Sequence, residues 1–198
     1  MSILTLIGSP SGKSRSSALL HHVASRLAER GMAVGEAGLR DIPADVLIEG
    51  RYASPAAEAL RRRVHSAHAV LISTPVYKAS FAGGLKAVLD LLDEKALADK
   101  VVLPIATGGS PAHLLALEYS LKPVLSALGA RHILAGVYAT DKQVSFDEQG
   151  RALIETDVRQ RLDEAAERLL KHLAPPRPGP GPEAVPLGPL AFAGRLGI

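Results

Sequence analysis

The sequence has no cysteine and no tryptophan, and aromatic residues make up only 4% of its 198 positions. Without cysteine the chain has no thiolate nucleophile, disulfide, iron–sulfur ligand or cysteine zinc site, so redox chemistry would require a bound cofactor. The scarcity of aromatic side chains disfavours stacking of single-stranded nucleic acid. Lysine and arginine number 23 against 20 acidic residues, and this small excess does not indicate nucleic-acid binding.

Long apolar runs are also missing. None approaches the roughly 20 residues that a membrane-spanning helix needs, and residues 1–9 show neither a basic leader nor a cleavage pattern. We therefore expect a cytoplasmic protein with no membrane partner. A composition of 47% hydrophobic and 22% charged residues is typical of one compact globular domain.

Short apolar runs alternate with stretches of helical spacing from residue 3 to about residue 173, which predicts an α/β three-layer sandwich. The five strands expected in its parallel sheet lie at 3–7, 33–37, 69–72, 101–105 and 133–138. Five helices are expected between and after them, at about 15–30, from 54 through 64 and on to the two histidines at 65 and 68, and at 83–92, 111–128 and 156–173. Pro104 is unexpected in a central strand because it has no N–H to donate.

Residues 175–198 hold seven of the 14 prolines, so they cannot form a regular helix or a central strand. We therefore expect one domain over 1–174 and a Pro/Gly-rich tail over 175–198. The tail either extends along the surface or packs on a neighbouring subunit.

The segment from Gly8 to Ser17 follows the first predicted strand and carries five serines, a lysine and an arginine. Backbone N–H groups at a helix start, the helix dipole, hydroxyls and cations together favour phosphate. The segment therefore predicts a phosphate-binding loop, although its serines could simply cap the helix.

Three better-known motifs do not fit this loop. The spacing from Gly8 to Gly12 is one residue short of a nucleoside-triphosphate loop, and Pro10 stands where a nucleophile elbow needs serine. The dinucleotide fingerprint G-x-G-x-x-G is absent from the sequence.

His65 and His68, three apart on one expected helix, have no third ligand at useful spacing, so no metal site is expected.

Two further loops are expected beside the first one. With strand order 2-1-3-4-5, residues 74–79 and 107–110 follow strands whose carboxyl ends meet at the same edge of the sheet. Main-chain atoms of these loops could hold a planar ring while the serine loop holds a phosphate. Pro75 could instead only shape a turn.

The helix expected over 111–128 contains Pro123, which has no N–H for the carbonyl of Tyr119 four residues earlier. The proline ring also crowds that turn, so we expect a π-bulge near Tyr119. A simple proline kink is the alternative.

With these features the chain resembles the flavodoxin-like NAD(P)H-dependent FMN reductases, most closely the flavin reductase of two-component alkanesulfonate monooxygenase systems. The resemblance covers about 3–173 and rests on segments 8–10, 14–17, 53–55, 74–79, 85–92, 100–104, 106–109, 112–116 and 119–128. It is broken at Ser11-Gly12-Lys13 and in the tail.

The resemblance implies which residues bind the cofactors. The FMN phosphate would be bound by Ser9, Arg15, Ser16 and Ser17. The flavin ring would lie against Pro75, Val76, Tyr77, Lys78, Ala79, Thr107, Gly108 and Gly109. His113 would lie on the nicotinamide side. Tyr119 would mark an inserted residue that forms a π-helix at a tetramer interface near the flavin.

The resemblance also implies a reaction. NADPH or NADH would reduce FMN without a catalytic side chain, and the reduced FMN would pass to a flavin-dependent monooxygenase of sulfonate and sulfur assimilation. The protein would be a homo-oligomer, either a dimer or a tetramer. Two alternatives keep the same fold: a quinone or azo-compound reductase with tightly bound FMN, and a flavodoxin-type electron carrier.

Overall fold

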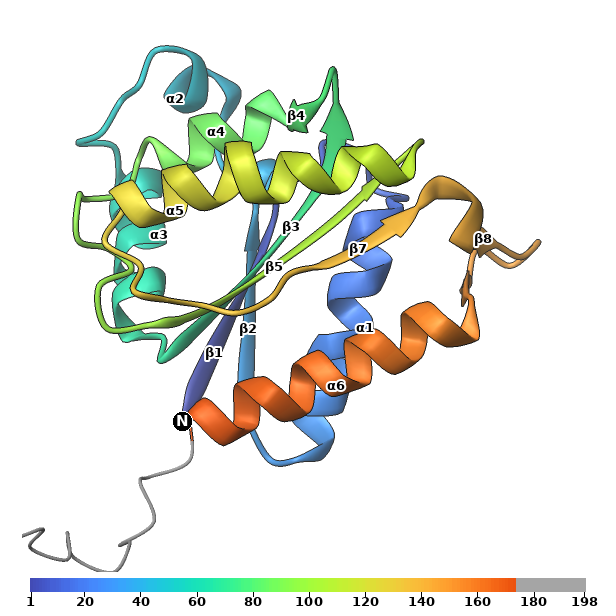
Figure 1. Ribbon diagram of the computed structural model, residues 1–198. Coiled ribbons are helices and arrows are strands. Elements are labelled where there is room, and N and C mark those ends of the chain that lie inside the picture. The colour runs from blue at the N-terminus through green and yellow to red at the C-terminus, as the bar shows by residue number, and fades with distance from the viewer. Residues whose placement is uncertain (174–198) are drawn as a thin grey trace, which may run out of the picture.

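A computed structural model describes residues 1–173 as a parallel sheet between two layers of helices (Figure 1). The tail over 175–198 lies outside the described residues. The strands are β1 (Ser2–Ile7), β2 (Ala33–Gly38), β3 (Ala69–Tyr77), β4 (Ser80–Phe81), β5 (Val101–Gly108), β6 (His132–Ile133), β7 (Val137–Thr140), β8 (Val144–Phe146) and β9 (Ala152–Ile154). The α-helices are α1 (Arg15–Glu29), α2 (Ala44–Ile48), α3 (Pro55–Ser66), α4 (Gly83–Leu89), α5 (Lys122–Ala127) and α6 (Thr156–Leu173).

The main sheet has the order β2-β1-β3-β5-β6, with β7 also pairing with β5 and β4 pairing with β3. The predicted order 2-1-3-4-5 is confirmed for the parallel strands, and so is the three-layer class. The predicted number of strands is wrong, because the sheet has seven rather than five.

One additional strand arises because the fifth expected strand is split. The Val101 N–H donates to His68 on the β3 side, and the Val102 carbonyl accepts from Leu134 on the other side. This alternation points Pro104 toward the edge strand, where its missing N–H cannot form a ladder bond. The edge strand is interrupted there, between β6 and β7.

The other additional strand, β4, shows that β3 is longer than expected. β3 continues through residues 73–77, which were expected to be loop, and then turns back antiparallel into β4. Lys78 and Ala79 form the turn with φ of 49° and 62°, the positive values that two-residue hairpins favour. β5 likewise runs three residues past its expected end, to Gly108.

The helical segment after β5 contains the expected irregularity. It begins with one 3₁₀ turn at Pro111–Leu114, passes through a π-helix at Leu117–Leu121 and continues as α5. The Lys122 N–H donates to the Leu117 carbonyl five residues earlier, which is π-helical bonding. The predicted π-bulge near Tyr119 is therefore confirmed.

Three smaller expectations were wrong. α4 ends at Leu89 rather than Leu92, because Leu91 and Leu92 turn back with bonds to residues three earlier. His68 does not share a helix with His65, because α3 ends at Ser66 and the His68 N–H donates to the Ser2 carbonyl beside β1. Residues 39–54 were expected to be irregular but include η1 (Leu39–Asp41) and α2.

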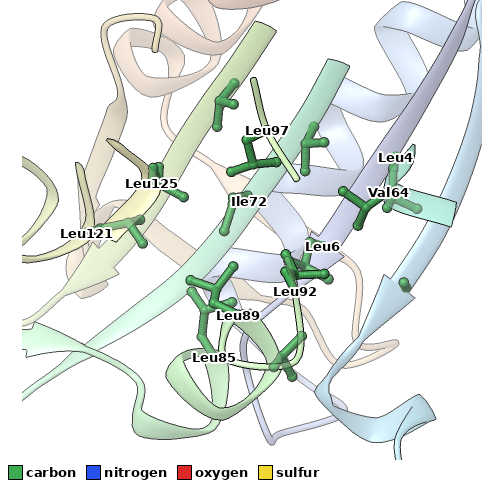
Figure 2. Packing of buried hydrophobic residues seen from close by; sticks show 14 of the residues in the cluster. Leu4, Leu6, Val64, Ile72, Leu85, Leu89, Leu92, Leu97, Leu121 and Leu125 are labelled. Atoms are coloured by element: carbon green, nitrogen blue, oxygen red, sulfur yellow. The ribbon is translucent and has the colours of Figure 1, made fainter. Parts of the chain in front are cut away.

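Alternate residues of the central strands face opposite layers, as the two-residue period of a strand requires. Leu4, Leu6 and Ile72 pack against α3, α4 and α5 (Figure 2). Ile3 and Leu71 pack on the other face against α1 and α6. Each face therefore has its own apolar core, and the sheet holds the loops at its carboxyl edge between two rigid layers.

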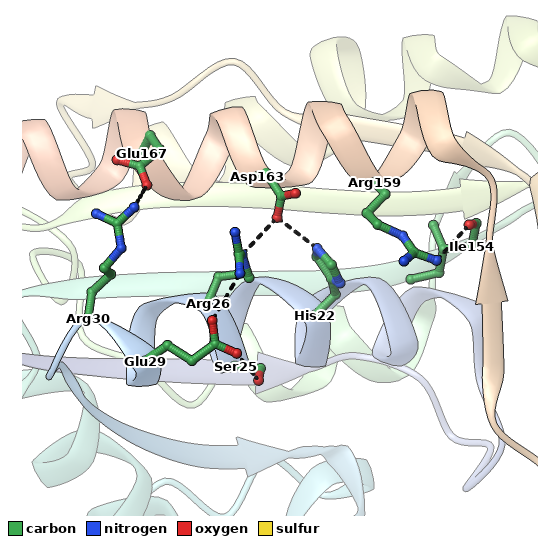
Figure 3. Close-up of polar contacts among 9 residues, drawn as sticks. All are labelled: His22, Ser25, Arg26, Glu29, Arg30, Ile154, Arg159, Asp163 and Glu167. Atoms are coloured by element: carbon green, nitrogen blue, oxygen red, sulfur yellow. Dashed lines mark hydrogen bonds and ion pairs between the residues drawn. The ribbon is translucent and has the colours of Figure 1, made fainter.

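Polar contacts link α1 to α6 at the surface of the second layer. Asp163 of α6 accepts from Arg26 of α1 at 3.1 Å and lies 2.9 Å from the Nε2 of His22, as Figure 3 shows. Over residues 1–173, no helix is both long and apolar enough to cross a membrane.

Candidate functional site

A cavity of about 240 Å³ lies at the carboxyl ends of β1, β3 and β5. It is lined by Ser9, Ser11, Lys13, Ser14, Arg15, Pro75, Val76, Tyr77, Thr107, Gly108 and Asp141. The three segments expected to meet at this edge therefore do so. A larger cavity of about 490 Å³ lies at the opposite end of the sheet, whereas open parallel sheets bind ligands at the carboxyl ends.

The serine-rich loop leads directly into α1, a helix of 15 residues. Ser14 is its N-cap, and its hydroxyl accepts from the Ser17 N–H at 3.4 Å and bonds to the Ser16 hydroxyl at 3.0 Å. The Ser9 hydroxyl accepts from the Ser11 N–H at 3.2 Å. One serine therefore caps the helix, and the others line or support the same bend.

The Ser17 hydroxyl suggests that the bend is built for an anion. Ser17 lies in the first turn of α1, and its Oγ is buried without a hydrogen-bond partner among residues 1–173. A buried polar group that lacks a partner costs about 1–3 kcal/mol, so such groups are rare unless a ligand or water satisfies them. The dipole at the start of α1 favours a negative charge.

Gly8 lets this bend approach its neighbours closely. A Cβ at Gly8 would lie 2.7 Å from the Ser73 carbonyl oxygen and 2.8 Å from the Leu85 Cβ. Its N–H donates to that same carbonyl at 2.8 Å. Any larger residue would push the loop away from the end of β3.

The two cations of the loop contact a hairpin formed by β8 and β9. Arg15 lines the cavity and donates from Nε to the Val144 carbonyl at 2.8 Å. The Lys13 ammonium lies 4.8 Å from the centroid of the Phe146 ring. The sequence analysis did not predict this hairpin. Its signal was the alternation of apolar and polar residues before Gly150 and the apolar run after it, and Gly150 itself adopts a positive φ of 79° in the turn.

The predicted site residues divide into two groups. Seven of them line the cavity: Ser9, Arg15, Pro75, Val76, Tyr77, Thr107 and Gly108. The other seven do not line it: Ser16, Ser17, Lys78, Ala79, Gly109, His113 and Tyr119. Ser16 and Ser17 lie in the first turn of α1, Lys78 and Ala79 form the hairpin turn, and Gly109 and His113 follow β5. Tyr119 is 78% exposed in the π-helix.

Sequence reasoning missed Asp141, which follows β7 and lines the cavity. Asp141 follows the strand next to β5, so the rule that ligands bind beyond the carboxyl ends of parallel strands could have identified it from the sequence. Within residues 1–173, no three histidine, aspartate or glutamate side chains gather as metal ligands would. The cavity therefore suits a ligand that joins an anionic group to a flat one. Its hydroxyls and two cations can bind the anion, and main-chain atoms at the strand ends can contact the flat group.

Comparisons with known proteins agree with this chemistry. Residues 1–145 match the family described as NADPH-dependent FMN reductase. The chain is 47% identical over 180 residues to FMN reductase (NADPH) of Pseudomonas putida, covering 90% of this chain and 91% of the relative. It is 46% identical over 167 residues to FMN reductase (NADPH) of Escherichia coli, covering 84% and 87%.

A solved structure has the same fold. The apo form of the NADH:FMN oxidoreductase EMOB superposes with a TM-score of 0.78 at 33% identity, covering 89% of this chain and 91% of that one.

Proposed function

The chain belongs to the NADPH-dependent FMN reductase family, and from this premise we propose that its carboxyl-edge cavity binds FMN as a substrate that leaves after reduction. The observation that carries the proposal is the cavity itself, because it joins the phosphate loop to two strand ends suited to a flat ring. The flavin-dependent monooxygenase expected to receive the product belongs to this proposal.

The phosphate of FMN would occupy the bend before α1. Hydroxyls of Ser9, Ser16 and Ser17 would donate to its oxygens, and Arg15 would neutralise part of its charge. The phosphate would supply the acceptor that the buried Ser17 hydroxyl lacks. The N–H groups that begin α1 add the attraction of the helix dipole.

The ring of FMN would lie where β3 and β5 end. Pro75, Val76 and Tyr77 of β3 line the cavity together with Thr107 and Gly108 of the neighbouring strand β5. The hairpin turn at Lys78 and Ala79 would help to border the ring, and Gly109 would continue the glycine-rich end of β5. Gly108 brings main-chain atoms close to the ring because it has no side chain.

Bound FMN supplies the hydride-accepting chemistry of the reaction, with NADPH or NADH as donor. The chain contributes position: the two strand ends orient the ring, and the phosphate loop fixes its distance from the edge of the sheet. His113 would lie on the side from which the nicotinamide approaches. Main-chain donors would favour the reduced, more negative ring, and no side chain needs to transfer a proton.

The exposed apolar side chains after β5 support a further part of the proposal. Leu114, Leu115 and Tyr119 are 43%, 55% and 78% exposed in the helical segment that follows β5. Covering such side chains is a common reason for subunits to associate. We therefore expect a dimer or tetramer, with Tyr119 at the interface, and light scattering would measure its mass.

Steady-state kinetics with purified protein tests whether FMN is a substrate. The rate of NADPH oxidation should rise from near zero and saturate as FMN is added. A rate independent of added FMN, but dependent on a quinone or an azo dye, would indicate tightly bound flavin and contradict the proposal. Flavin binding without NADPH oxidation would indicate an electron carrier instead.

A further inference from the structure

Tyr138 lies on β7, the strand that pairs with the glycine-rich end of β5. It is paired in register with Ala106 and is only 7% exposed. Its hydroxyl donates to the Ser110 carbonyl at 2.6 Å, so it bonds to the chain just beyond the cavity wall. A tyrosine hydroxyl is protonated at neutral pH and can donate, and burial and the nearby Asp141 carboxylate raise the pKa of Tyr138 further above its ordinary 10.0.

The same hydroxyl occupies space that a side chain at position 108 would need. A Cβ at Gly108 would lie 2.8 Å from the Tyr138 hydroxyl, 3.2 Å from the Nδ1 of His113 and 3.2 Å from the Cβ of Val76. Gly108 lines the cavity, so the tyrosine oxygen lies against a residue of the cavity wall. The distance of 2.8 Å between this Cβ and the Tyr138 hydroxyl is the shortest of the three, so a side chain at position 108 would force one of the two residues to move.

The backbone of Tyr138 is itself anchored to the helical layer. Arg161 of α6 donates from Nη1 to the Tyr138 carbonyl at 2.7 Å and also bonds to Asp157 at 3.1 Å. A side chain on a strand held from both sides has little freedom to move. Tyr138 can therefore fix the turn over 108–110 in one position.

We infer that Tyr138 is a positioning residue for the flavin site: its hydroxyl holds the 108–110 turn where the ring of FMN is proposed to bind. The inference rests on the proposed function and deepens it. Tyr138 is absent from the residues that line the cavity, so it acts through the Ser110 carbonyl and the backbone of Gly108.

The first test compares Tyr138→Phe with Thr5→Val. Thr5 is also buried, and its hydroxyl donates to the Gly35 carbonyl at 3.2 Å near the other edge of the sheet. Each substitution removes one buried hydroxyl-to-carbonyl bond. Flavin fluorescence titration should show the Kd for FMN rising about three- to tenfold in Tyr138→Phe and staying within about twofold of wild type in Thr5→Val.

Riboflavin separates a ring effect from a phosphate effect. Because the 108–110 turn is proposed to hold the ring, Tyr138→Phe should weaken riboflavin and FMN by the same factor. Unfolding in urea measures how much stability each variant loses. The inference is overturned if Tyr138→Phe binds both flavins like wild type, or if Thr5→Val weakens them equally for an equal loss of stability.

The second test is a double-mutant cycle with Gly108→Ala. The new methyl group meets the tyrosine hydroxyl in the wild-type background, but Tyr138→Phe removes that oxygen. Gly108→Ala should therefore raise the Kd for FMN at least about threefold more in the wild-type background than in Tyr138→Phe. Equal factors in both backgrounds would overturn the direct contact.

Wild-type protein serves as the control for the proposed function. If it binds FMN and Tyr138→Phe binds equally well, only the role of Tyr138 is overturned. If wild-type protein binds no FMN, the proposed function fails and the inference fails with it.

Discussion

Replacing Arg15 with alanine separates binding of the phosphate from the architecture of the loop. Arg15 lines the cavity and donates from Nε to the Val144 carbonyl at 2.8 Å, so its guanidinium is held beside the proposed phosphate site. Arg15→Ala removes both the cation and this anchor of the β8–β9 hairpin. The two losses must be measured apart.

The expected magnitude follows from the bond that is lost. A hydrogen bond that involves a charged group contributes about 1.5–3 kcal/mol, so the Kd for FMN should rise about tenfold to 150-fold. Riboflavin has no phosphate, and its Kd should stay within about twofold of wild type. Fluorescence titration with each flavin measures both quantities.

Arg159→Ala is the matched control. Arg159 donates from Nη2 to the Ile154 carbonyl at 3.2 Å (Figure 3), and Ile154 is the register partner of Val144. The control removes an arginine from the base of the same hairpin but leaves the cavity unchanged. It should bind FMN like wild type.

Two results would refute this reasoning. An unchanged affinity of Arg15→Ala for FMN would remove the guanidinium from the phosphate site. An equal loss of affinity for FMN and riboflavin, or a similar loss in Arg159→Ala, would show that the hairpin rather than the charge matters.

Three further predictions concern stability, each measured by urea denaturation. Gly8→Ala should lower the free energy of unfolding by about 1–3 kcal/mol, because its Cβ would lie 2.7 Å from the Ser73 carbonyl; an unchanged midpoint would mean that the loop relaxes. Leu162→Ala, in the fully buried stripe of α6, should cost about 2–5 kcal/mol, and a loss under about 1 kcal/mol would contradict that burial. The raised pKa of Tyr138 means that the folded state retains this proton above pH 10.0, so stability should fall as pH rises through that value. The free energy of unfolding of Tyr138→Phe should fall less steeply with pH than that of wild type. Equal slopes in the two proteins would contradict the assignment of this pH dependence to Tyr138.

The central part of the fold could be predicted from the sequence because its signals are local. Apolar runs buried on both faces marked β1, β3 and β5. α6 was marked by apolar residues three or four apart, at Val158, Leu162, Ala165, Leu169 and Leu173. Pro123 predicted the π-helix because a missing N–H changes the bonding of its own helix.

The remaining features depend on contacts between distant segments. The break between β6 and β7 is caused by Pro104 on the neighbouring strand, so the sequence of the edge strand does not contain the reason for it. The β8–β9 hairpin is short and is held partly by Arg15, which lies 129 residues before Val144. The cavity was expected because a parallel sheet brings its carboxyl ends together, and the same rule could have included Asp141 after β7. The supporting Tyr138 became visible only in three dimensions, because its bond to the Ser110 carbonyl joins residues 28 apart in the sequence.

A crystal structure of the protein grown with FMN tests the central claim most directly. We predict difference density for FMN in the cavity, with phosphate oxygens within hydrogen-bond distance of Ser9, Arg15, Ser16 and Ser17 and the ring between Pro75–Tyr77 and Thr107–Gly109. FMN bound elsewhere, or an ordered cavity that contains only solvent at saturating FMN, would contradict the account.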